Sequence, residues 1–198
     1  STANVISAGT HYDYNTFFSS QDAPAQTCGQ SANEHKDIWF KYKASSTGTL
    51  VINNSSSYNS RISVYSGSCG SLSLQSCAYL DSYLGGTNSL TLSVCKNTNY
   101  FISVGGTYSG IGAGSLSLSL TPVNTLPTIT CPSNINLFNS TGICGRNYNY
   151  TPPVGTDNCL GAVTTQIAGL SSGSTFPIGI TTNTFRVIDS DGSSAQCS

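Results

Sequence analysis

The sequence predicts an all-β protein made of two β-sandwich domains in series. Helical periodicity is almost absent, whereas short segments of alternating apolar and polar residues recur roughly every eight to fifteen positions between Gly, Asn, Ser and Pro. The chain has 198 residues, which is enough for two modest domains that each have a core. Eight cysteines and no methionine predict an oxidising compartment and structural disulfides.

The first domain is expected to span residues 1–123 and to contain seven strands. In segments such as ISVY and LSLSL, apolar and hydroxyl side chains alternate, so one face of each strand belongs to the core and the other to solvent. The Gly-rich stretch 105–114 is expected to form a loop. The expected strands are Asp37–Lys43, Thr49–Asn53, Arg61–Ser66, Ser76–Leu80, Ser89–Val94, Tyr100–Val104 and Ser115–Leu120.

Pro122 and Pro127 mark the domain boundary, because two prolines so close together leave no room for a strand between them. The second domain is expected to span residues 124–198. A sandwich of that size has a thin core, which disulfides help to stabilise. Its expected strands are Ile129–Cys131, Ile135–Phe138, Cys144–Tyr150, Ala162–Ile167, Thr181–Ile188 and Ala195–Ser198.

The composition excludes several classes of function. Charged residues form only 8% of the chain and the formal net charge is −1, so no basic surface is expected for nucleic acid or an anionic membrane. His11 and His35 have no nucleophile beside them, and carboxylates are few, so we predict no enzyme and no cofactor. No apolar run approaches a membrane span, and residues 1–4 lack signal-peptide features, so the chain is interpreted as secreted and already processed.

Three motifs of the second domain resemble the hyalin repeat, an immunoglobulin-like sandwich of extracellular adhesion proteins and secreted bacterial surface proteins. They are PTITCPSNINL, TGICGRNYNYTPPVGTDNC and GLSSGSTFPIGITTNTFRVIDSDGSSAQC. The resemblance implies adhesive or spacer duties without catalytic residues. Members of that family usually carry more strand residues after the final cysteine, so the last strand is expected to be incomplete. Either the sequence is a fragment of a longer tandem protein, or another chain supplies the missing edge. An unpaired edge in a small sandwich is a template for strand addition.

The first domain resembles the bacterial pre-peptidase C-terminal type of module, a β-sandwich of jelly-roll kind. The resemblance rests on DIWFKYKASSTGTLVINNSS, RISVYSGSCGSLSLQSC and NTNYFISVGGTYSGIGAGSLSLSL. The acidic loop of that family is replaced here by residues 78–83, which argues against a metal site in this loop. Modules of the two kinds occur together in secreted proteins of the Bacteroidota, often exported by the type IX secretion system, and the resemblance implies that context.

Four cysteines in each domain would allow nine sets of pairings. In the first domain one pair flanks a hairpin and the other follows by elimination. In the second domain the resemblance to hyalin repeats implies that the first and last cysteines pair, which leaves the middle two. The predicted bridges are Cys69–Cys77, Cys28–Cys95, Cys131–Cys197 and Cys144–Cys159. No C-x-x-C motif or histidine cluster suggests zinc.

Aromatic residues supply the candidate contact sites. Trp39, the only tryptophan, is expected on the inner face of the first sandwich, and Tyr148 and Tyr150 are expected to share an inner face of the second. Four aromatic residues before the first expected strand pack either on their own domain or on a second subunit, and are candidate assembly contacts: Tyr12, Tyr14, Phe17 and Phe18. The candidate glycan contacts are Tyr58, Tyr79, Tyr83 and Tyr108.

Asp157, Asp189 and Asp191 form a weak calcium candidate in turns at one end of the second domain. Calcium takes six to eight oxygen ligands, for which three carboxylates are few. Aspartate in D-x-D-G is also expected as a turn former. The sequence therefore predicts no metal site.

Together these features predict a non-enzymatic, extracellular structural protein, a subunit or segment of a bacterial surface adhesin or filament. It is expected to associate with itself through a β-edge and the N-terminal aromatic segment, because a neutral surface packs against copies without charge repulsion. Two alternatives remain open. One is a carbohydrate-binding accessory region of a secreted hydrolase with surface glycans as partners, and the other is an inert spacer of a giant surface protein.

Overall fold

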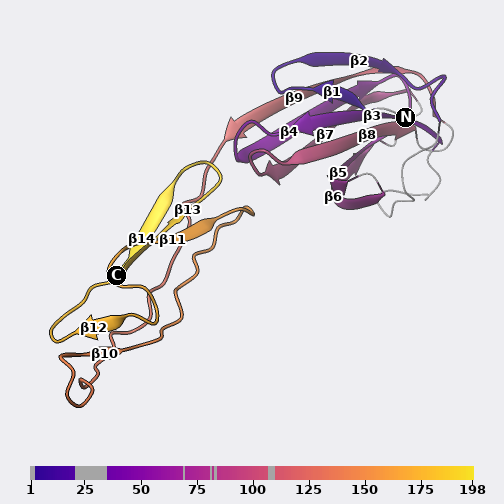
Figure 1. Cartoon of the computed structure of the whole chain (residues 1–198). Coiled ribbons are helices and arrows are strands. Elements are labelled where there is room, and N and C mark those ends of the chain that lie inside the picture. Colours follow the sequence, from indigo (N-terminus) through magenta and orange to yellow (C-terminus); the bar gives the residue numbers. More distant parts are fainter. Residues whose placement is uncertain (1–2, 21–34, 69, 81, 83, 107–109) are drawn as a thin grey trace. The chain divides into compact units, whose positions relative to one another are not determined.

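The computed structural model describes residues 3–20, 35–68, 70–80, 82, 84–106 and 110–198. Throughout this part of the chain the regular elements are β-strands, as the sequence predicted (Figure 1). The search for a helix long and apolar enough to cross a membrane found none among the described residues. The chain divides into two compact units, Ser1–Val123 and Asn124–Ser198.

The first unit is a sandwich of two sheets. One sheet has the strand order β1-β3-β8-β5-β6 and the other β2-β9-β4-β7, and every neighbouring pair is antiparallel except β1 with β3. All seven expected strands are present as β3–β9, and β1 and β2 precede them. The strands are β1 (Asn4–Ile6), β2 (His11–Asn15), β3 (His35–Lys43), β4 (Gly48–Ser56), β5 (Ser60–Ser68), β6 (Ser71–Tyr79), β7 (Gly86–Val94), β8 (Asn99–Gly106) and β9 (Ala113–Pro122).

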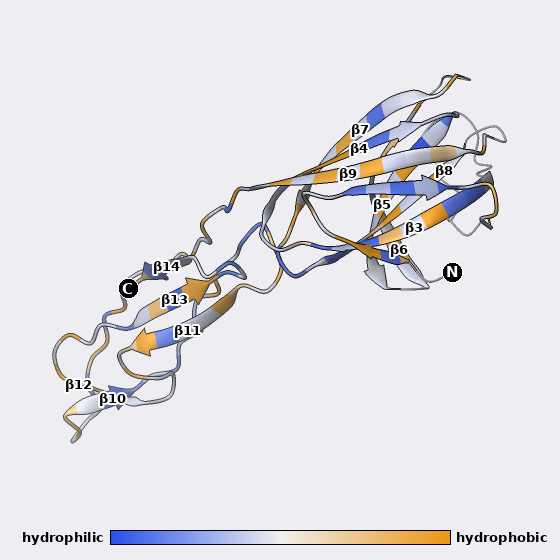
Figure 2. Cartoon of the chain, turned by 90° about the horizontal axis from the view of Figure 1, so that it is seen from above, coloured by the Kyte–Doolittle hydropathy of each residue, from blue (hydrophilic) through white to orange (hydrophobic). Residues whose placement is uncertain are grey.

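The core of the first unit lies between its two sheets. Hydrophobic residues recur along its strands with more polar residues between them (Figure 2). Leu50 and Ile52 of β4 and Ile102 of β8 are completely buried there, because alternate positions of each strand face inward. The expected loop 105–114 is shorter than predicted, since β8 continues to Gly106 and β9 begins at Ala113.

A chain of buried polar side chains crosses this core. The Tyr14 hydroxyl of β2 donates a hydrogen bond of 2.6 Å to Asn54 Oδ1 of β4. The Asn54 amide in turn donates to Ser60 Oγ and to Asn88 Oδ1, both at 2.9 Å. Satisfied buried polar groups of this kind fix one arrangement of the strands, because any other arrangement leaves them unpaired.

Trp39 is buried, but not on the inner face that the sequence predicted. Its neighbour Phe40 packs in the core between the sheets, so the side chain of Trp39 lies on the opposite face of β3. There its ring centroid is 5.4 Å from that of Tyr65. The prediction failed because it assumed that a buried residue lies on the inner face. A residue on the outer face of a sheet can also be buried, and the alternation of the strand is then unchanged.

The second unit has shorter strands and fewer buried side chains. Its two sheets have the orders β10-β12 and β11-β13-β14. The strands are β10 (Gly145–Asn147), β11 (Val163–Ala168), β12 (Thr175–Pro177), β13 (Thr184–Ile188) and β14 (Ser194–Cys197). Cys159, Phe185 and Val187 are its buried hydrophobic residues.

Two strands expected at the start of the second unit are absent. Ile129–Cys131 and Ile135–Phe138 are extended sequences, but the only pairing nearby is an isolated bridge between Thr128 and Thr156. No strand of the described chain lies beside them in hydrogen-bonding register. A strand needs such a neighbour, so these segments remain without regular structure.

The buried tyrosines predict that the first unit loses stability at alkaline pH. Burial, together with the nearby Tyr100, raises the pKa of Tyr42 above its ordinary value, and burial likewise raises the pKa of Tyr58. The unfolded chain therefore loses these protons first, near pH 10, and the free energy of unfolding falls as the pH rises through that region.

We predict that Tyr42→Phe reduces the loss of stability between about pH 9 and about pH 11, because it removes one phenol that ionises only on unfolding. Urea unfolding of the wild type and variant at both pH values measures this. Tyr79→Phe is the matched control, since this ring is exposed on β6. An equal alkaline loss in all three proteins would contradict the prediction.

Candidate assembly groove of the second unit

A groove of about 680 Å³ lies in the second unit. Its lining includes two continuous segments, residues 131–139 and residues 176–183, which we call its walls. Ser198, directly after β14, and Arg146 of β10 also line it. We call this feature the assembly groove.

The floor of the groove is aromatic. Tyr150 lies with its ring centroid 6.3 Å from that of Phe176 and 6.1 Å from that of Phe185, both in edge-to-face geometry. Its hydroxyl donates a hydrogen bond of 2.7 Å to the carbonyl of Leu170, which fixes the ring in place. Tyr148 also lines the groove, in agreement with the expectation that the two tyrosines share a face.

The walls expose apolar side chains to solvent. Phe138 is 89% exposed and Ile180 is 98% exposed, and Ile135, Leu137 and Ile178 are also exposed. Arg146 is the only charged residue among those that line the groove, and its guanidinium donates to the carbonyl of Phe138 at 3.3 Å. Exposed apolar surface of this kind is typical of interaction sites in soluble proteins.

Both walls have unpaired backbones. No hydrogen bond joins the backbone groups of residues 132–137 or 178–182 to any described part of the chain. Both segments line the groove. Each therefore offers backbone groups to which an added strand can hydrogen-bond.

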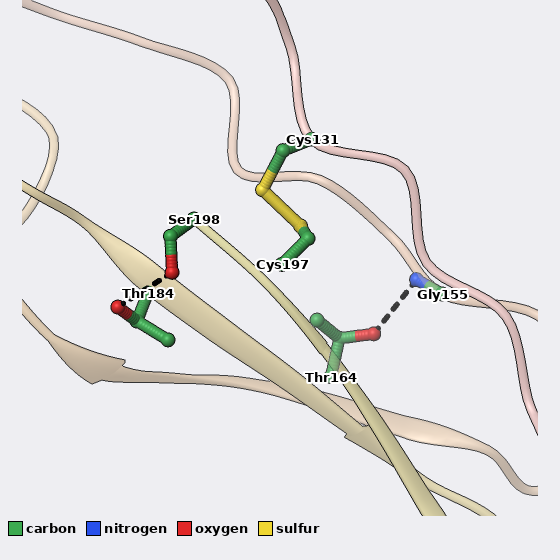
Figure 3. Close-up of a disulfide and its surroundings, with 6 residues drawn as sticks. All are labelled: Cys131, Gly155, Thr164, Thr184, Cys197 and Ser198. Carbon is green, nitrogen blue, oxygen red and sulfur yellow. Dashed lines mark hydrogen bonds between the residues drawn. A yellow bond between two sulfur atoms is a disulfide. The ribbon is translucent and has the colours of Figure 1, made fainter.

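The groove begins where β14 ends. β14 pairs with β13 up to Cys197 opposite Phe185, and the hydroxyls of Ser198 and Thr184 lie 3.0 Å apart (Figure 3). Cys197 forms a disulfide with Cys131, with an S–S length of 2.05 Å and a Cα–Cα distance of 5.5 Å (Figure 3). The disulfide thus holds the first wall against the end of β14.

Gly155 lies close to β11 and β13. Its amide donates a hydrogen bond of 2.9 Å to Thr164 Oγ1 of β11 (Figure 3). A Cβ added at Gly155 would lie 2.6 Å from Cβ of the buried Val187. Only glycine lets the backbone approach β13 this closely.

The cysteine predictions have different outcomes. The Cys131–Cys197 bridge is confirmed. Cys144 is exposed and free, so the predicted Cys144–Cys159 bridge is wrong. Cys159 is buried and disulfide-bonded, but not to Cys144. Cys77 and Cys95 are disulfide-bonded, and their predicted partners, Cys69 and Cys28, lie outside the described residues.

The N-terminal aromatic residues divide into two pairs. Tyr14 is buried in the core of its own unit, and both Tyr12 and Tyr14 contact Phe40. Of the two alternatives left open by the sequence, Tyr12 and Tyr14 follow packing on their own domain, because β2 pairs with β9 and directs these rings inward. Phe17 and Phe18 are exposed and contact each other.

The predicted glycan contacts do not form a platform in the described structure. Tyr58 is 4% exposed and belongs to the core, so its assignment is wrong. Tyr79 is exposed on β6. Tyr83 and Tyr108 lie outside the described residues.

The calcium candidate is also wrong. Among the described residues no group of three or more metal-binding side chains comes together, so Asp157, Asp189 and Asp191 do not form a cluster. Asp189 is a turn former. Burial opposes its ionisation, but hydrogen bonds from Asn124 and from the backbone amides of residues 191–193 lower its pKa.

The disulfide is expected to supply much of the stability of the second unit. Its ring spans a sequence separation of 66 residues, so the double variant Cys131→Ser/Cys197→Ser should lose about 4 kcal/mol of unfolding free energy by the loop-entropy relation. Denaturant unfolding of the full chain measures the loss. Cys144→Ser is the control, since that thiol is free and exposed, and its stability should equal that of the wild type. A double variant as stable as this control would contradict the expectation.

Comparisons with known proteins match a family to each of the two units. A family model described as HYR domain matches residues 124–198, which confirms the resemblance to the hyalin repeat. Comparison with curated protein sequences gives no match. Among solved structures, the chain is similar to the pre-peptidase C-terminal domain of a collagenase from Bacillus anthracis. The identity is 12%, the alignment covers 60% of this chain and 95% of that chain, and the TM-score is 0.37.

A second family model, described as galactose binding domain-like and associated with the type IX secretion system, matches residues 1–116. Both matched families are binding-type domains without catalytic function. Together with the disulfides, they indicate a secreted or cell-surface protein. Because the second match covers more than half of the chain, the protein belongs to the galactose binding domain-like family associated with type IX secretion.

Proposed function

We propose that this extracellular protein assembles with copies of itself, as a subunit or segment of a surface adhesin or filament, by receiving a β-strand in the assembly groove. The observation that carries the proposal is an apolar groove lined by two segments, residues 132–137 and 178–182, whose backbones have no hydrogen bond to any described part of the chain. Strand addition satisfies such backbones, and side-chain pockets select the sequence that enters.

The groove offers two kinds of contact to an incoming strand. Backbone groups on both walls can exchange hydrogen bonds with it, as in any three-stranded ladder. Side chains that alternate toward the floor would meet the rings of Tyr150 and Phe185, and would be removed from water there. The occupant is therefore an extended segment with apolar residues at alternate positions.

Charge favours a second copy of the chain as the source of that segment. The chain carries only 8% charged residues and a formal net charge of −1, so copies approach one another with little repulsion. Arg146 is the only charged group that lines the groove. A neutral strand can enter without the burial of a second, unpaired charge.

Carbohydrate binding is the second candidate, because the family description of residues 1–116 refers to galactose. Sugar sites commonly expose aromatic rings for stacking. Of the four tyrosines predicted for that role, only Tyr79 is exposed in the described part of the chain, and the ring pair Trp39 and Tyr65 is buried. The first unit therefore supports this function less strongly than the groove supports assembly.

A single substitution in the groove tests the proposal. Ile180→Asp places a carboxylate on the wall where a strand must pack. Ile180 is 98% exposed, so the fold does not depend on its side chain. We predict that the wild type forms oligomers or filaments, by sedimentation velocity and electron microscopy, and that this variant stays monomeric.

Leu160→Asp is the matched control. Leu160 is also 98% exposed and belongs to the same unit, but it does not line the groove. This variant should assemble like the wild type. If the wild type stays monomeric at every concentration, the protein is a spacer or a ligand-binding region and the proposal fails. Equal assembly of Ile180→Asp and the wild type would exclude the groove.

A further inference from the structure

We infer that strand β7 of the first unit pairs with β7 of a second copy, in antiparallel orientation about a two-fold axis. This contact uses a different surface from the assembly groove and does not depend on it. It follows from a comparison of the sheet edges in the described structure and from the side chains that two β7 strands would bring together.

Three of the four sheet edges in the first unit are protected against pairing with another chain. β1 has only three residues, and β2 has five and carries the exposed pair His11 and Asp13. The ladder of β6 with β5 has a register shift between Val64 and Tyr65. Short length, charge and an irregular ladder are the devices by which soluble proteins protect their edges.

β7 is the edge that has none of these devices. It lies at the outside of its sheet and pairs with β4 at nine consecutive positions without a register shift (Figure 2). Its sequence, GTNSLTLSV, contains no charged residue and no proline. Apart from the ladder with β4, no hydrogen bond joins the backbone of residues 86–94 to any described part of the chain. A long, regular and uncharged edge is a template for a further strand.

The outer face of β7 is complementary to itself. A two-fold axis perpendicular to the sheet at Leu90 places all nine residues of one strand opposite nine of the other. Thr87 then lies opposite Ser93 of the second copy, and Ser89 lies opposite Thr91. These four side chains are exposed, and hydroxyls on directly opposed residues of neighbouring strands form favourable cross-strand pairs.

The inner face of β7 is complementary to itself as well. Leu90 is buried in the core and would lie opposite its own counterpart, with the half-buried Leu92 two positions along the strand. The apolar layers of the two copies therefore meet, and Leu92 loses contact with water. The pairing buries no charged side chain, and a formal net charge of −1 gives little repulsion between copies.

The contact is weak between two copies in dilute solution. Each copy contributes a single strand, whereas association costs translational and rotational freedom. Ile180→Asp thus stays monomeric at the concentrations used for sedimentation velocity. Pairing becomes significant where copies are held close together, because the effective concentration is then high.

Covalent trapping at high protein concentration tests the pairing and its register. Every protein in the test carries Ile180→Asp, which removes the groove contact, and Cys144→Ser, which removes the exposed free thiol. The matched variant adds Thr87→Cys and Ser93→Cys, which oppose each other across the axis. Under mild oxidation it should form a covalent dimer, in which mass spectrometry finds position 87 of one copy linked to position 93 of the other.

The control for random collision is the mismatched variant, which carries Thr87→Cys and Thr91→Cys on the same strand. It has the same number of added thiols, but none opposes another across the axis, so their Cα atoms are too far apart for a disulfide. Its dimer yield should be about tenfold lower or less. Equal yields from the two variants, or no dimer from either, would overturn the proposal.

An added charge on the edge provides a second readout. Thr91→Lys, introduced into the matched variant, brings two lysines together near the axis and should lower the dimer yield about tenfold. Ser119→Lys is its control, since Ser119 is exposed on the same sheet but belongs to the inner strand β9, and it should leave the yield unchanged. An undiminished yield with Thr91→Lys would contradict the pairing.

Near-ultraviolet circular dichroism establishes that each variant is folded before its dimer yield is compared. Because the groove contact is removed from every protein in the test, the result does not depend on the proposed function. Failure of the trapping overturns the β7 contact alone, and failure of the groove experiment leaves this contact standing.

Discussion

The disulfide between Cys131 and Cys197 is the constraint on which the second unit depends. Only Cys159, Phe185 and Val187 are its buried hydrophobic residues, so its core contributes little to holding the walls in place. The backbone of residues 132–137 has no hydrogen bond to any described part of the chain, and the disulfide fixes the start of this segment to β14. At the other end the Arg146 guanidinium donates to the carbonyl of Phe138. A covalent bond and a hydrogen bond thus hold the two ends of this segment.

The first unit, by contrast, is stabilised by a large core. Its two sheets enclose fully buried Leu50, Ile52 and Ile102, and the Tyr14–Asn54 hydrogen bond ties edge strand β2 into the core. Strands β3–β9 are long and paired along most of their length. The first unit therefore depends on its core and its ladders, whereas the second depends on its disulfide.

The alternation of apolar and polar residues predicted the first unit well, because β3–β9 each bury one face. It missed β1, since three residues are too few to show a period, and β2, whose HYDYN sequence reads as polar. In the second unit the same reasoning produced two strands that do not exist. PTITC and INLF have strand character, but a strand needs a neighbour, and sequence alternation says nothing about whether one is present.

The side-chain predictions failed for a related reason. Tyr14, Tyr58 and Trp39 were placed by sequence context, yet the partner that buries each of them is distant along the chain: Asn54 for Tyr14 and Tyr65 for Trp39. The Cys131–Cys197 bridge could be predicted because the hyalin-repeat motifs surround both cysteines. The free Cys144 could not, because pairing by elimination assumes that every cysteine has a partner. An open strand edge was expected, whereas the aromatic floor of the groove was not.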